Sequence, residues 1–113
     1  MVALRFKAGT LVARLDTTLF PGLLAFCQIA EEVLGINEVW ITSVNEGRHK
    51  SQSLHYAGRA VDIRRNIFPE DLAHEVTRRF KALYDSEYDL IEEAVGQPNE
   101  HWHLEFDPGN KNR

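Results

Sequence analysis

Cysteine is nearly absent from this chain of 113 residues, and Cys27 is the only one. A single cysteine cannot close a disulfide within the chain, so the fold does not depend on an oxidising compartment. Long apolar runs are also missing, since no stretch approaches the roughly 18 apolar residues of a membrane span. We therefore expect neither a disulfide framework nor a membrane-spanning segment.

Positive charge is in the minority, with 13 Lys and Arg against 17 Asp and Glu and a net charge of -4. This balance argues against a general nucleic-acid binder, which is usually basic. The first seven residues, MVALRFK, lack the apolar core of a secretory signal, so we expect synthesis in the cytoplasm. The length suits one domain over residues 1–113, and we expect a monomer with no nucleic-acid or membrane partner.

Hydrophobic periodicity predicts two helices and five short strands. Both helices are expected to begin at a proline, and Gly35 suits the left-handed residue after the first of them. The helices are expected over residues 21–34 and 69–84, and the strands over 1–6, 39–44, 60–63, 88–95 and 101–106. Because helices and strands mix without a regular βαβ rhythm, we predict an α+β fold with a small, largely antiparallel sheet and flanking helices.

The last of these strands alternates polar and apolar residues. His101, His103 and Glu105 are expected on one side, and the three intervening apolar residues on the other. The apolar side is the natural core side, so the histidine side is expected to line a cleft or face solvent. The pairs Arg64-Arg65 and Arg78-Arg79 are interpreted as solvated faces, and Cys27 as a core residue.

The histidines suggest a metal site. A catalytic zinc ion takes three protein ligands from His, Asp or Glu and keeps one open position. His55 and Asp62 lie on either side of Gly58. A turn at this glycine, between a loop and the following strand, could bring both side chains close together. Either His101 or His103 would supply the third ligand from a neighbouring strand. Each residue also has an ordinary interpretation, as a solvated loop histidine, a turn aspartate or part of a surface strand.

Two motifs resemble a known family. The stretch Ser53-x-His55-x-x-Gly58-x-Ala60-x-Asp62 resembles the signature of zinc D-Ala-D-Ala peptidases, a group that includes D,D-dipeptidases and several phage endolysins. The longer string SLHYAGRAVDI is similar to the signalling domain of Hedgehog proteins, which shares the fold.

The second motif, Glu100-His101-Trp102-His103, resembles the Glu-x-x-His element that closes the same zinc site in the peptidases. The resemblance covers about residues 42–107, and within this range the two motifs are specific and the stretch between them is not. The two motifs imply a Hedgehog- or D,D-peptidase-like fold with Zn²⁺ as the cofactor.

The resemblance implies His55, Asp62 and His103 as zinc ligands. It implies Glu100 as the general base that takes a proton from the attacking water. Hedgehog domains carry an acidic residue where this chain has Gln97, so the base must be Glu100 or a neighbour such as Glu93. Glu100 and His103 are three positions apart, so in a regular strand their side chains would point to opposite faces of the sheet. They share a site only if the strand begins with a bend near Glu100.

Other site residues keep alternatives open. His49 matches a histidine at that offset in Hedgehog domains, whereas Arg48 could correspond to the upstream arginine that polarises the substrate carbonyl in the dipeptidases. Ser53 could bind substrate or hold its loop. His101 projects to the same side as His103 and could contact substrate or support the metal site.

The resemblance implies a zinc peptidase acting on peptidoglycan stem peptides, at a D-Ala-D-Ala or an L-Ala-D-Glu bond. A phage-type endolysin released by a holin fits the small size. A non-catalytic zinc-containing binding domain of the Hedgehog kind is the alternative from another class. A structural zinc protein is a third, and His101 would then be the fourth ligand.

Overall fold

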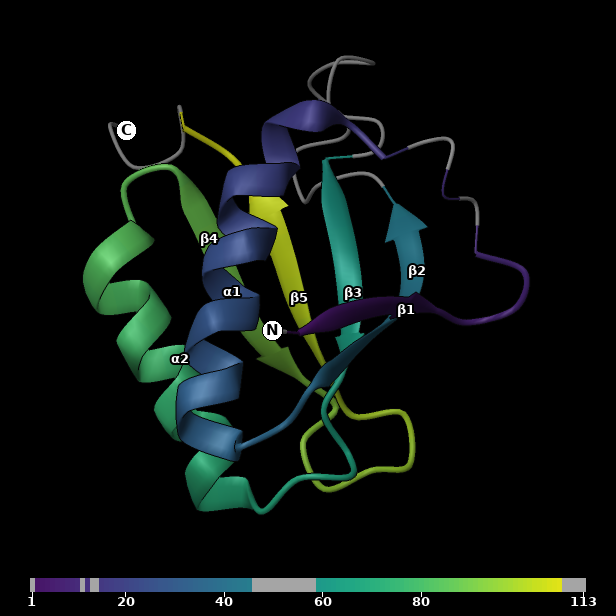
Figure 1. Ribbon diagram of the computed structural model, residues 1–113, viewed down its shortest axis with the longest axis vertical. Coiled ribbons are helices and arrows are strands. Elements are labelled where there is room, and N and C mark those ends of the chain that lie inside the picture. Colours follow the sequence, from purple (N-terminus) through teal and green to yellow (C-terminus); the bar gives the residue numbers. More distant parts are fainter. Residues whose placement is uncertain (1, 11, 13–14, 46–58, 109–113) are drawn as a thin grey trace.

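The computed structural model describes residues 2–10, 12, 15–45 and 59–108 (Figure 1). In this part of the chain the elements are β1 (Ala3–Phe6), a short 3-10 helix η2 (Thr17–Leu19), α1 (Phe20–Leu34), β2 (Glu38–Asn45), β3 (Ala60–Arg64), α2 (Glu70–Tyr84), β4 (Tyr88–Glu93) and β5 (His101–Phe106). The predicted α+β class is confirmed.

The strands form one five-stranded sheet in the order β1-β2-β3-β5-β4. β2, β3, β5 and β4 pair antiparallel, but β1 pairs parallel to β2. The sheet is therefore mixed, and the prediction of a largely antiparallel sheet is wrong. The reason is α1, which lies between β1 and β2 in the chain and returns it so that both strands run in the same direction.

Helix and strand boundaries follow local chemistry. Pro21 lies in the first turn of α1, and Gly35 ends this helix with a left-handed φ of 67°. Pro69 precedes α2, as predicted. β4 ends at Glu93 rather than at Val95, because Ala94 has a positive φ of 54° and begins a turn.

Both helices cover the same face of the sheet (Figure 1). Trp102 and Leu104 of β5 are buried on that face, as the alternation predicted, and Phe26 of α1 packs edge-on against Trp102 with 5.0 Å between ring centroids. Cys27 is also a core residue, and burial raises the pKa of its thiol to about 11. The core thus lies between the helices and one face, and the opposite face of the sheet carries the polar residues of β3 and β5.

The segment Thr17–Leu34 reaches 18 residues at a mean hydropathy of 1.2, so by length and composition it could cross a membrane. The segment includes Gln28, Glu31 and Glu32, so it is not a continuous apolar run, and the absence of a membrane-spanning segment stays a prediction. In the structure 44% of the segment is buried inside the protein, and Leu23, Phe26 and Ala30 are fully buried core residues of α1. Core packing accounts for its apolar character.

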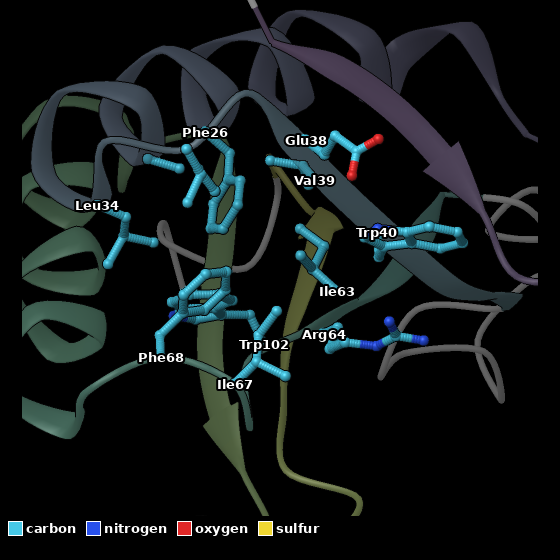
Figure 2. Close-up of a pocket in the computed structure, with 12 residues that line it drawn as sticks. Phe26, Leu34, Glu38, Val39, Trp40, Ile63, Arg64, Ile67, Phe68 and Trp102 are labelled. Carbon is cyan, nitrogen blue, oxygen red and sulfur yellow. The ribbon is translucent and has the colours of Figure 1, made fainter.

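An apolar crevice opens between α1 and the sheet, beside Phe26, Phe68 and Trp102 (Figure 2). Its free volume is about 10 Å³, close to the space that one water molecule needs. The crevice is filled by the side chains that line it, so the ligand-sized space of the described residues lies elsewhere.

Candidate metal centre and cleft

Asp62 and His103, which come from the two separate motifs, lie side by side on the face opposite the helices. They are directly paired residues of the antiparallel strands β3 and β5. Such pairs point to the same face of a sheet, and here His103 Nδ1 lies 2.9 Å from Asp62 Oδ1. Two residues that lie 41 positions apart in the sequence therefore present their polar atoms to one point.

The second ring nitrogen of His103 is engaged by Glu105. Nε2 lies 2.8 Å from Glu105 Oε1, and both side chains are buried. Burial alone would lower the pKa of His103, but the hydrogen bonds to Asp62 and Glu105 outweigh it and raise this pKa to about 9. His103 is thus held between two carboxylates, one at each nitrogen.

Asp62 has its own support. Ser43 of β2 donates a hydrogen bond from Oγ to Asp62 Oδ2 at 2.7 Å. Burial raises the pKa of Asp62, yet the hydrogen bonds from His103 and Ser43 have the larger combined effect and lower it below its usual value. Asp62 is therefore held as an oriented carboxylate that faces the charged ring of His103.

His101 lies next to this pair. Its Nδ1 is 2.8 Å from the carbonyl oxygen of Asn99, which can only accept, so Nδ1 carries a proton. Its Nε2 lies 3.0 Å from Glu93 Oε1 and 3.7 Å from Asp62 Oδ1. Potential ligand atoms of Asp62, Glu93 and His101 all lie within 4.8 Å of one another. His101 and Glu93 thus border the site, as the shared strand face predicted for His101.

Glu100 lies just before β5 and lines the cleft. Its carboxylate pairs with Arg65, whose guanidinium lies over the Trp102 ring on the core side of the sheet, so the parity mismatch with His103 remains. One carboxylate oxygen accepts a hydrogen bond from the backbone N–H of Gly96 at 3.0 Å, and the other forms an ion pair with Arg65. Arg65 is fully buried and also pairs with Glu70 and Glu92. Glu100 is therefore held in place by a buried cation.

The cleft that these residues border has a volume of about 620 Å³. This is within the range of small-ligand sites, about 300–1,000 Å³. Polar groups of three strands and the 94–100 turn surround it. Its lining residues are Lys7, Thr42, Ser43, Asp62, Arg64, Asn66, Ile67, Pro98, Asn99, Glu100 and His101.

Asp62 and His103 are residue types that zinc takes as ligands, and His103 would bind the ion only after it loses the proton that it shares with Asp62. Ligands of one tetrahedral zinc ion lie about 3.3 Å apart for bond lengths near 2.05 Å, so the hydrogen-bonded Asp62 and His103, at 2.9 Å, would move slightly apart around an ion. Glu105 would then orient His103 through the nitrogen that does not face the ion, an arrangement common at zinc sites. The other expected site residues, Arg48, His49, Ser53 and His55, lie outside the described residues.

Sequence reasoning missed four residues of this region: Ser43, Arg64, Arg65 and Glu105. Arg65 is buried and not part of a solvated face as predicted, whereas Arg78 and Arg79 are exposed and pair with Glu75. The parity of β5 had placed Glu105 beside His103, so this residue could have been found. Ser43 and Arg64 required the pairing partners of β3.

No protein-family model, curated protein or solved structure matches this chain. The likeness to the peptidases therefore consists of the two motifs and their order in the sequence.

Proposed function

We propose that this protein is a zinc-dependent peptidase that hydrolyses peptidoglycan stem peptides. The observation that carries the proposal is the 2.9 Å contact between Asp62 and His103, because it joins the two motifs at one point beside a ligand-sized cleft. The bond would be of the D-Ala-D-Ala or the L-Ala-D-Glu type. A phage-type endolysin that a holin releases to the wall is the form of this proposal that fits the small size.

The residues would act as follows. Asp62 and His103, with His55 from the resemblance, would hold the Zn²⁺ ion. When bound, zinc supplies a Lewis acid and lowers the pKa of water to about 7. Glu100 would accept the proton of the attacking water and deliver it to the leaving amine. His49 or Arg48 would stabilise the oxyanion of the tetrahedral intermediate.

The identity of the base gives the first test. Glu100→Gln is expected to lower kcat by about 10²- to 10⁴-fold while the zinc content stays at one ion per chain, because the amide cannot accept the proton. Rates on a synthetic stem peptide and metal analysis of the same samples measure both quantities. Glu93→Gln is the matched control, since Glu93 borders the same site but contacts His101 rather than Arg65.

A loss with Glu93→Gln that exceeds the loss with Glu100→Gln would move the role of the base to Glu93. An unchanged rate in both variants would contradict general-base catalysis by either carboxylate.

The contact between Glu105 and His103 gives a second test, on metal affinity. Glu105→Gln is expected to weaken zinc binding by about 10- to 100-fold, because the amide orients His103 less firmly and makes it a poorer ligand. Competition with a fluorescent chelator measures the affinity directly. Asp89→Asn is the control, because its carboxylate lies within 4.8 Å of that of Glu105 and the change removes the same charge from the same neighbourhood. An equal loss of zinc affinity in both variants would show that the effect comes from removal of one negative charge and not from the orientation of His103.

A non-catalytic zinc-containing binding domain is the second candidate. It is favoured by the ion pair between Arg65 and Glu100, because a carboxylate that is engaged by a buried guanidinium is less available as a base. Zinc-loaded wild-type protein that binds stem peptides without hydrolysing them would support this candidate over the peptidase.

A further inference from the structure

Arg64 lies in the cleft close to the candidate metal centre. It follows Asp62 by two positions on β3, so both side chains point to the same face and their Cα atoms lie about 7 Å apart. Its paired residue on β5 is His101, and all three residues line the cleft. Arg64 is thus the cationic side chain of β3 that adjoins the metal ligands.

The guanidinium of Arg64 is held against an aromatic ring, and no carboxylate of the described residues forms an ion pair with it. Its central carbon lies 5.0 Å from the centroid of the Trp40 ring, and the side chain is half-buried. Figure 2 shows the Arg64 guanidinium near the Trp40 ring, at the rim of the apolar crevice that both residues also line. Among the described residues Arg64 has no ion pair, whereas its neighbour Arg65 pairs with three carboxylates. Its hydrogen-bond donors are therefore oriented and available to a ligand.

We propose that Arg64 binds a free carboxylate on the substrate residue that leaves as the amine product. This inference rests on the proposed function and narrows its substrate class. A guanidinium that is stacked on an aromatic ring presents a planar fork of donors, which matches a carboxylate in two parallel hydrogen bonds. The proposal places the scissile carbonyl at Asp62 and His103 and assigns the amine side of the bond to the Arg64 end of the cleft.

The two candidate bonds share this chemistry. In D-Ala-D-Ala the leaving residue carries its terminal carboxylate on the Cα atom next to the scissile nitrogen. In L-Ala-D-Glu the D-Glu residue continues the stem through its side-chain carboxyl group, so its α-carboxylate is free at the same position. An Arg64 site would accept both leaving residues and disfavour those in which this group is an amide.

The test compares two synthetic stem peptides that differ only at this group, a carboxylate in one and a carboxamide in the other. Wild-type zinc-loaded protein is expected to cleave the carboxylate peptide with a kcat/KM about 10- to 100-fold higher, the value of a charge-assisted hydrogen-bonded pair. Arg64→Gln is expected to remove this preference by slowing the carboxylate peptide alone. Arg64→Lys keeps the charge without the fork and is expected to restore only part of the preference.

Lys7→Gln is the matched control, because it removes the same charge from an exposed position on the same cleft. It is expected to keep the preference of the wild type. Equal cleavage of both peptides by wild type, or equal slowing of both by Arg64→Gln, would overturn the assignment of Arg64 and leave the peptidase intact. Cleavage of neither peptide by folded, zinc-bound wild type would instead contradict the proposed function.

Discussion

Replacement of His103 by alanine is expected to abolish hydrolysis, with a fall in kcat/KM on the order of 10⁴-fold or more. The change removes a proposed zinc ligand from a site whose metal would provide most of a rate acceleration of at least about 10⁶-fold. Metal analysis after dialysis is expected to find the zinc content reduced together with the activity. Rates on stem peptides and zinc content, measured on one preparation, check both statements.

Asp62→Asn provides a second variant of nearly unchanged shape, so that misfolding of His103→Ala does not decide the outcome. His74→Ala is the matched histidine control, because His74 lies on the exposed surface of α2 with 63% of its side chain accessible. It is expected to keep wild-type zinc content and activity. Full zinc content and full activity in either Asp62→Asn or His103→Ala would contradict the assigned ligands.

Replacement of Arg65 by methionine is expected to lower the free energy of unfolding by about 3–5 kcal/mol. Burial lowers the pKa of Arg65, but the hydrogen bonds to Glu70, Glu92 and Glu100 have the larger combined effect and raise it above its ordinary value. Methionine keeps much of the apolar stem but leaves the partly buried Glu92 and Glu100 without their cation. Because whole domains are stable by about 5–15 kcal/mol, the loss is expected to be large in urea unfolding.

Arg79→Met is the matched control, since Arg79 is 46% exposed and pairs with Glu75 on the surface of α2. Exposed ion pairs contribute about 0–1 kcal/mol, so this variant is expected to unfold near the wild-type midpoint. Equal unfolding midpoints for Arg65→Met and wild type would contradict this prediction. They would mean that the desolvation penalty of the buried charges is as large as the favourable energy of the three ion pairs. The ion pair between Arg65 and Glu100 would then make no net contribution to the free energy of unfolding.

Local signals were sufficient to predict most of the fold. The helix ends at Pro21, Gly35 and Pro69 and the alternation of residues 101–106 depend on neighbouring residues. The structure confirms the alternation and the end at Gly35, and it begins the two helices within one residue of the prolines. The direction of β1 relative to β2 depends instead on how α1 returns the chain, which no local pattern encodes. The mixed sheet could therefore not be distinguished from an antiparallel one.

The candidate site divides in the same way. The motifs identified Asp62 and His103, and strand parity placed His101 on their face, because these relations depend on spacing within one segment. The ion pair of Arg65 with Glu100 joins residues 35 positions apart and depends on the pairing of β3 with β5, which brings the backbone N–H of Arg65 to the carbonyl oxygen of Glu100. The same limit applies to Arg64, whose position against Trp40 follows from the pairing of β2 with β3.

The central claim is tested most directly by digestion of purified peptidoglycan and synthetic stem peptides with zinc-loaded protein, with mass spectrometry of the products. Glu100→Ala and His103→Ala are digested in parallel. The peptidase predicts one defined new amine terminus from the wild type, at a single type of bond, and none from either variant. Intact substrates after incubation with folded, zinc-bound wild type would contradict it and favour the non-catalytic binding domain.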